Sequence, residues 1–185
     1  MNFFYTIFLL WILSEVYLNR SARSAQKNRA SQDANTEWLL WITIVVSMTS
    51  GIFISGKFSF PITSDEITGA AGITLVISGI ILRFIAIRQL GKNFTVDVST
   101  QEDQELKQDG FYRYLRHPSY SASLLSFGGF GLFLNNWISL IIVIVLPFLA
   151  FKRRINVEEE VLLKQFGKQY SDYISKTRRI IPFLY

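Results

Sequence analysis

The chain has 185 residues, half of them hydrophobic and 15% aromatic, and its mean hydropathy is positive at +0.27. These values exclude an ordinary soluble domain and indicate a membrane protein. The sequence contains no cysteine, which excludes disulfide bonds, zinc–thiolate sites and cysteine nucleophiles.

Five apolar runs, taken in chain order, predict five transmembrane helices. They cover residues 3–18, 38–55, 67–87, 120–134 and 137–151. A helix rises 1.5 Å per residue, so runs of this kind can cross a hydrocarbon core of about 30 Å. Only Asn135 and Asn136 separate the last two runs, which predicts a tight helical hairpin.

The first run, which Glu15 interrupts near its end, is predicted to be a membrane span and not a signal peptide. Its basic residues follow the apolar stretch instead of preceding it, and no cleavage site of small residues comes after it. The predicted fold is therefore an all-α integral membrane bundle of five transmembrane helices, with cytoplasmic amphipathic and C-terminal helices.

The basic residues predict the orientation, because Lys and Arg near span ends are retained in the cytoplasm. Nearly all of them follow the first, third and fifth runs or lie in the tail, and only Lys57 falls on the opposite side. We therefore expect a multi-pass protein with the N-terminus outside and the C-terminus in the cytoplasm. The net charge of +5 then reflects topology and attraction to anionic membrane lipids, with no nucleic acid as partner.

The first cytoplasmic segment, residues 91–119, is predicted to lie at the membrane interface. Ser99 or Thr100 can cap a short amphipathic stretch that Gly110 ends. His117 precedes a proline and is therefore disfavoured in the α region, whereas Pro118 suits the first turn of a helix. A purely structural alternative is that Arg116 and His117 only anchor this segment at the lipid headgroups.

The second cytoplasmic segment, residues 152–185, carries charges next to aromatic residues. Arg154 and Glu158 are spaced i,i+4, so both lie on one helix face. For the next two carboxylates, Glu159 and Glu160, we expect a solvated charge run with ordinary helix pairing. Aromatic residues recur at helical spacing further along, which is more typical of packing than of a cofactor site.

Together the two segments carry a specific pair of motifs. "GFYRYLRHPSY" and, after the hairpin, "EEEVLLKQFGKQYSDYISKTRRIIP" resemble the isoprenylcysteine carboxyl methyltransferase family and its relatives among the phospholipid methyltransferases. The resemblance covers residues 90–182. It divides the chain into N-terminal helices, residues 1–90, and a methyltransferase-like catalytic half, residues 91–185.

The resemblance implies a membrane enzyme whose cofactor, S-adenosylmethionine, lies in a cytoplasmic pocket closed by the C-terminal helix. It places the cofactor contacts on Tyr112, His117, Pro118, Ser119, Tyr120 and Glu158, with further contacts near residues 104–107. It makes Arg154 the substrate-binding arginine. The chemistry agrees, because the cofactor ammonium needs a carboxylate such as Glu158 and its carboxylate needs donors such as Arg116 and His117. We therefore predict Arg154 and Arg116 as catalytic residues.

The expected acceptor is lipophilic, a small molecule or a lipid-modified substrate that enters from the bilayer, and most simply a carboxylate. A carboxylate acceptor needs no general base, whereas an amine or enol would need one, and His117 is the only histidine. The glycine-rich turn of Rossmann-type methyltransferases is absent from the sequence.

Two alternatives remain open. One is a membrane sterol-type reductase that uses NADPH, which would need additional basic groups for the cofactor phosphate. The other is a non-enzymatic scaffold or transporter subunit. Arg83 is the one charge well inside a run, and its position near the cytoplasmic end suits snorkelling or a polar cavity better than a conduction path.

Overall fold

The computed structural model describes residues 6, 8–15, 17–18, 34–64, 67–91 and 106–181, and these residues are helical with short connections. After the helical residues 8–15 come α2 (Ala34–Lys57), α3 (Ile67–Leu90), the short 3₁₀ helix η2 (Gly110–Arg113), α4 (Pro118–Phe133), α5 (Trp137–Phe166) and α6 (Lys168–Lys176). Within the described ranges there is no strand, only an isolated bridge between Leu115 and Arg178. The all-α prediction is confirmed for this part of the chain.

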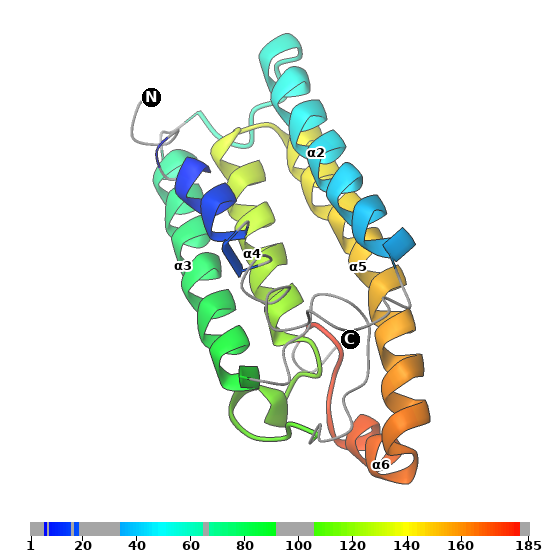
Figure 1. The fold of residues 1–185 in the computed structure, drawn as a ribbon. Helices are drawn as coiled ribbons and strands as arrows, with labels where there is room; N and C mark the ends of the chain where they lie inside the picture. Colours follow the sequence, from blue (N-terminus) through cyan, green and yellow to red (C-terminus); the bar gives the residue numbers. More distant parts are fainter. Residues whose placement is uncertain are drawn as a thin grey trace.

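The long helices form two pairs, α3 with α4 and α2 with α5, and the α4–α5 hairpin joins the pairs (Figure 1). The N-terminal helical segment packs on α4, with Trp11 edge-on to Phe127 at a ring distance of 5.1 Å. Its helical residues lie beside α3 and α4 in the figure.

Glycines allow α3 and α4 to approach closely along what we call the glycine seam, formed by Gly72, Gly79, Gly129 and Ser126. A Cβ atom added at Gly72 would lie 2.6 Å from the Gly129 carbonyl oxygen, and one at Gly79 would lie 2.1 Å from Ser126 Oγ. Small residues at such positions are a common way for membrane helices to pack backbone against backbone.

In the part of the chain that the structure describes, two helices are long and apolar enough to cross a membrane: residues 38–57 of α2 and all of α3. Large apolar side chains remain exposed on both, such as Phe53 of α2 at 61% and Ile81 of α3 at 53%. These surfaces fit contact with lipid. The count of five spans stays a prediction, although the predicted helical hairpin between the fourth and fifth runs is confirmed.

The hairpin turn is held to the α2–α3 loop by the two asparagines, which we call the asparagine turn. Asn135, with φ of 46°, accepts hydrogen bonds at Oδ1 from the Ile62 and Thr63 amides at 3.1 and 3.2 Å. Asn136 caps α5 through Oδ1 and donates from Nδ2 to the Phe58 carbonyl at 2.7 Å. The side-chain amides thereby bind backbone groups of a loop far away in sequence.

Helix α5 continues well beyond residue 151, where the predicted span ends, and its second half carries the acidic motif. It ends at Phe166, because Gly167 adopts a φ of +50° that favours glycine. Residues 177–181, the C-terminal strap, follow α6 and return toward α4 (Figure 1).

Candidate active site

The C-terminal strap runs alongside the segment that precedes α4. The Arg116 amide donates to the Arg178 carbonyl at 2.7 Å, and the His117 amide donates to the Arg179 carbonyl at 3.0 Å. Ser121 Oγ donates to the Ile180 carbonyl. The structure therefore brings the two sequence motifs together, as the resemblance implied.

His117 lies between two carboxylates of α5. Its Nδ1 is 3.4 Å from Glu158 Oε2, and its Nε2 is 3.3 Å from Glu159 Oε1. Its backbone is outside the α region, at φ −127° and ψ 58°, and Pro118 begins the helix, as both residue types predicted. Burial disfavours the imidazolium, but the hydrogen bonds with Glu158 and Glu159 outweigh it and raise the pKa of His117 above its usual value.

Glu159 contacts three basic side chains, Arg116, His117 and Arg179, and we call these four residues the Glu159 cluster. Arg116 Nε lies 2.8 Å from Glu159 Oε1, and Arg179 Nη2 lies 2.6 Å from Glu159 Oε2. Burial opposes ionisation of Glu159, yet its bonds with His117 and Arg116 lower its pKa to about 2. The expectation of a solvated charge is wrong for Glu159, which is 7% exposed, whereas Glu160 is exposed as expected.

Arg116 also binds the end of α6 and the beginning of the strap. Its Nη1 donates to the Thr177 carbonyl at 2.6 Å and approaches Thr177 Oγ1 and the Ile174 carbonyl, both at 3.3 Å. These contacts and the pair with Glu159 fix its guanidinium between α5 and the strap. Simple anchoring of Arg116 and His117 at the headgroups is therefore wrong, because their partners are within the protein.

Glu158 contacts Tyr120 and Arg154, and we call these three residues the Glu158 cluster. Arg154 Nε donates to the Tyr120 hydroxyl at 2.9 Å and to Glu158 Oε1 at 3.0 Å, and the Tyr120 hydroxyl donates to the same Oε1. Arg154 is only 5% exposed. Glu158 and Arg154 thus pair along one helix face, as their spacing predicted, and Tyr120 joins them from α4.

The other predicted cofactor residues have structural contacts of their own. The Tyr112 hydroxyl donates to the Ala86 carbonyl at 3.3 Å, which packs η2 against α3. The Tyr112 carbonyl accepts a hydrogen bond from Tyr173 of α6. The Ser119 carbonyl accepts one from Arg83 Nη1 at 3.2 Å. Ser99 and Thr100, and residues 104 and 105 of the expected upstream contact region, lie outside the described residues.

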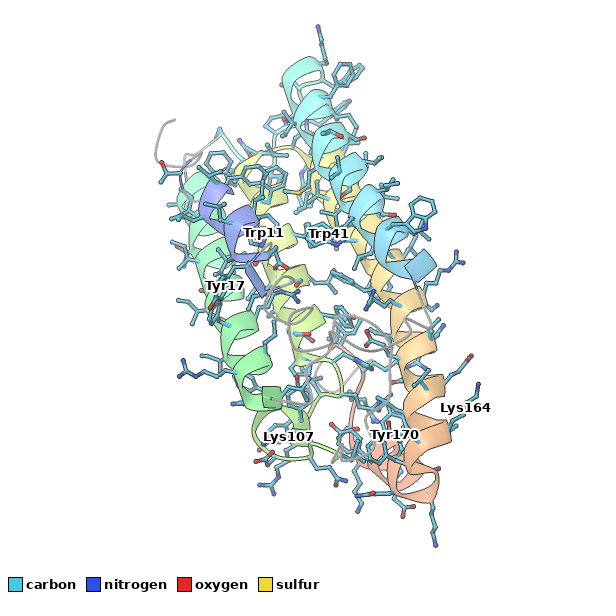
Figure 2. The ribbon with its side chains drawn as sticks, in the orientation of Figure 1. Trp11, Tyr17, Trp41, Lys107, Lys164 and Tyr170 are labelled. Atoms are coloured by element: carbon cyan, nitrogen blue, oxygen red, sulfur yellow. The ribbon has the colours of Figure 1, made fainter. Side chains whose placement is uncertain are left out.

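An apolar cavity of about 90 Å³ adjoins the Glu158 cluster. Tyr120 and Phe151 form part of its wall, and among the described residues that line it only Glu15 and Arg83 are charged. The other residues that line it are Trp11, Ile12, Leu40, Trp41, Ile44, Met48, Ser123 and Phe127. In Figure 2, Trp11 and Trp41 lie between the N-terminal helical segment and α2.

Glu15 and Arg83 form an ion pair in this cavity, with 2.8 Å between Oε1 and Nε. The sequence analysis treated the two residues separately and missed this contact, as it missed the burial of Glu159. The available signal was that each is the one charge within an apolar run. A charge in such a run commonly has a partner on another span.

The residues fit the amino-acid part of S-adenosylmethionine by the chemistry of their donors and acceptors. Glu158 Oε1 is engaged by Tyr120 and Arg154, whereas Oε2 has its contact with His117 at 3.4 Å and can accept from an ammonium group. The Glu158 side chain is 20% exposed, so a ligand can reach it. In addition, the buried Tyr170 hydroxyl has no hydrogen-bond partner within the described residues.

Comparison with known proteins supports the family that the two sequence motifs resemble. The model of the isoprenylcysteine carboxyl methyltransferase family matches residues 72–164, half of the chain. Protein-S-isoprenylcysteine O-methyltransferase B of Arabidopsis thaliana is 37% identical over 115 residues, which are 61% of this chain and 58% of the relative. Protein-S-isoprenylcysteine O-methyltransferase of Schizosaccharomyces pombe is 27% identical over 197 residues, which are 98% of this chain and 83% of the relative.

A solved structure is similar along almost the whole chain. The eukaryotic intramembrane Ras methyltransferase, isoprenylcysteine carboxyl methyltransferase, matches with a TM-score of 0.69 and 26% identity, over 96% of this chain and 67% of its own. The chain spans 58% and 60% of the length of the first two curated relatives, from Arabidopsis thaliana and rice. The matched region contains His117, Arg154, Glu158 and Glu159.

Proposed function

This chain belongs to the isoprenylcysteine carboxyl methyltransferase family, and on that premise we propose that it transfers a methyl group from S-adenosylmethionine to a lipophilic carboxylate. It is an integral membrane protein with two helices suited to cross the bilayer and a close structural relative that is intramembrane. The acceptor is an isoprenylcysteine-type acid or another lipid acid that enters from the bilayer.

One observation carries this proposal: Tyr120 belongs both to the Glu158 cluster and to the wall of the apolar cavity. A methyltransferase for lipids must hold a polar donor and an apolar acceptor at neighbouring positions. The cluster offers charged groups for the amino-acid part of the cofactor, and the cavity offers apolar surface for an acyl or isoprenoid chain.

Glu158 would hold the cofactor ammonium, with His117, Pro118, Ser119, Tyr120 and Tyr112 around it. When bound, S-adenosylmethionine supplies a methyl group that is activated by its positive sulfur. Arg116 is predicted from the sequence as a catalytic residue. Because Arg116 and Glu159 have their contacts within the protein, we propose instead that they position His117 and the strap. The strap then supports the site from the side of α6.

Arg154 would bind the acceptor carboxylate by charge-assisted hydrogen bonds. An ionised carboxylate oxygen is already a nucleophile, so the site has to orient it and exclude water and does not have to remove a proton. Orientation of two reactants in a water-poor site accounts for up to roughly 7–11 kcal/mol of a reaction barrier. The rings of Phe151 and Tyr120, whose centroids lie 4.8 Å apart, form the apolar side of the proposed methyl-transfer site.

The first experiment measures which cofactor binds. We expect calorimetry on the purified protein in detergent to detect S-adenosylmethionine or its demethylated product and no binding of NADPH. The reductase alternative predicts the reverse, and saturable NADPH binding with no response to the methyl donor would overturn the proposal.

The acceptor is identified by incubating the protein with lipid extracts and methyl-labelled cofactor. A carboxylate acceptor gives a labelled methyl ester, and mild base releases the label as methanol. Label that resists base would instead indicate an amine acceptor, for which His117 is the available base.

Two substitutions separate the proposed roles within the Glu158 cluster. Glu158→Gln removes the carboxylate for the ammonium, so cofactor affinity should fall by roughly 1.5–3 kcal/mol. Arg154→Ala should leave cofactor affinity nearly intact and lower methyl transfer. Because the two side chains contact each other, the alternative is a simple i,i+4 pair worth about 0.3–0.5 kcal/mol. Unchanged affinity in the first variant, or full transfer in the second, would contradict the corresponding role.

The orientation of the bundle, with five spans and a cytoplasmic C-terminus, is also part of this proposal. The basic side chains support it: Lys107 and Lys164, labelled in Figure 2, lie at the same end of the bundle as α6. A reporter fused after Tyr185 should be active only in its cytoplasmic form, and one at Asn135 should behave oppositely. Both reporters on the same side would contradict the span count.

A further inference from the structure

The Glu15–Arg83 ion pair has no role in the proposed reaction as described so far. Arg83, on α3, lies 2.8 Å from Glu15 and donates through Nη1 to the Ser119 carbonyl, directly before Tyr120. Both side chains line the apolar cavity and remain partly exposed, Arg83 by 17% and Glu15 by 18%. The pair therefore lies at the wall of the cavity next to the Glu158 cluster, where Arg83 Nε is buried while the rest of each side chain is partly exposed.

We propose that Glu15 is the internal counter-ion of Arg83, that the carboxylate of an entering acid first displaces Glu15 there, and that it passes from Arg83 to Arg154 for methyl transfer, so the cavity selects acidic acceptors over neutral ones. This inference rests on the proposed function, because it concerns the acceptor of that reaction. It makes Glu15 a specificity-determining residue. The ester product, which is neutral, cannot replace Glu15 at Arg83.

The surroundings of the pair explain why the exchange depends on charge. Around it the cavity wall is apolar and aromatic, including Trp11, Trp41 and Phe127. An unpaired guanidinium in such surroundings is costly, so Arg83 requires an anion at all times. An acid ligand supplies that anion, whereas an ester or alcohol of the same shape leaves the Glu15–Arg83 pair in place.

Glu15 can leave Arg83 because other residues hold the N-terminal helical segment on the bundle. Upstream, the rings of Phe8 and Trp11 pack on Phe130 and Phe127 at 5.3 and 5.1 Å. Downstream, the Tyr17 ring stacks on Phe84 of α3 at 6.4 Å. The Glu15 side chain can therefore turn away toward the interface, as long charged side chains near span ends do, without loss of these ring contacts.

The alternative is a purely structural pair that fixes the N-terminal segment on α3. It predicts that removal of the Glu15 charge loosens the segment and weakens every ligand of the cavity equally. Displacement of Glu15 by the ligand predicts that removal of the Glu15 charge raises the affinity for acids alone. A comparison of an acid with its own methyl ester therefore separates the two.

The test is a binding measurement that needs no turnover, because Trp11 and Trp41 line the cavity. A brominated fatty acid and its methyl ester serve as probes, and quenching of tryptophan fluorescence in detergent reports their affinity. In Glu15→Gln we expect the acid to bind roughly fivefold more tightly, as loss of a competing ion pair of about 1 kcal/mol implies. The ester should bind as it does to the unmodified protein.

Three further variants complete the design. Glu160→Gln removes an exposed carboxylate of α5 and should change neither affinity. Arg83→Gln should abolish the preference for acid over ester. Glu15→Asp keeps the charge but shortens its reach, so it should give a smaller gain for the acid, and it replaces Glu15→Gln if that variant does not fold.

Equal or weaker acid binding in Glu15→Gln, or an equal change for acid and ester, would overturn the inference. Its failure is distinct from failure of the proposed function. If the protein methylates a lipid acid but Glu15→Gln leaves the acid preference unchanged, only this inference is wrong. If the preference changes as expected but no methyl transfer occurs with any acceptor, only the proposed function is wrong.

Discussion

The two ends of the α4–α5 hairpin are both tied to distant segments, but by different chemistry. At the asparagine turn, neutral side-chain amides bind backbone groups of the α2–α3 loop. At the other end, the Glu159 cluster ties α5 to the strap through buried charges. A buried ion cluster is an expensive way to join segments, because desolvation offsets much of its attraction. We infer that the asparagine turn serves the fold, whereas the charged end is retained for ligands.

Removal of Glu159 is the strongest test of this contrast. Glu159→Ala leaves Arg116, His117 and Arg179 without their shared carboxylate, and loss of one partner of a buried pair costs about 3–5 kcal/mol. We expect a large fall in the free energy of unfolding, together with faster hydrogen exchange at residues 177–181. Unchanged exchange in the strap would show that the backbone bonds alone hold it.

A substitution in the asparagine turn should have a smaller effect than Glu159→Ala and should lower only the free energy of unfolding. Asn136→Ala removes the cap of α5 and the bond to the Phe58 carbonyl, with an expected cost of about 1–2 kcal/mol. Unfolding in mixed detergent micelles measures this loss. Cofactor affinity should be unaffected, so a reduced affinity would mean that the two ends are coupled.

A matched pair of arginines refines the description of the strap. Arg179 pairs with Glu159 and is 28% exposed, so Arg179→Ala should cost about 1 kcal/mol. Arg178 joins the strap through its backbone while its residue is exposed, and Arg178→Ala should cost close to nothing. Equal losses of unfolding free energy in the two variants would contradict the importance of the side-chain pair.

The smallest expected effect is a gradual change with pH in the free energy of unfolding that His117 contributes. Because the pKa of His117 is raised above 6.5, its contribution to stability is complete below pH 6.5 and is lost as pH rises through the raised value. The stability difference between the unmodified protein and His117→Gln should therefore shrink from pH 6.5 upward. The asparagine turn has no such group, so Asn136→Ala serves as the control, with a difference that does not change over this range.

Local features of this fold could be predicted from the sequence. The hairpin follows from two adjacent asparagines between apolar runs, and the backbone of His117 and Pro118 follows from proline sterics. Helix α5 extends further than predicted, since a fall in hydropathy marks the end of a span and not the end of a helix.

Long-range pairing could not be predicted in the same way. Helical spacing gave the Arg154–Glu158 pair, but nothing local indicates that Arg116 and Arg179 converge on Glu159. The partner of Arg83 likewise comes from another helix. The resemblance placed the two motifs together, whereas which carboxylate faces which cation is decided by the packing of α5 against the strap.

The glycine seam determines more than the closeness of two helices. Gly79 is one turn before Arg83 on α3, and Ser126 is two turns after Ser119 on α4, so their contact fixes how far one helix can slide along the other. A slip of one turn, about 5.4 Å, would carry Arg83 away from Ser119 and out of the cavity. The seam thus fixes the position of α3 along α4. A methyl group at Gly79 would change the distance between the Glu15–Arg83 pair and the Glu158 cluster without contacting either.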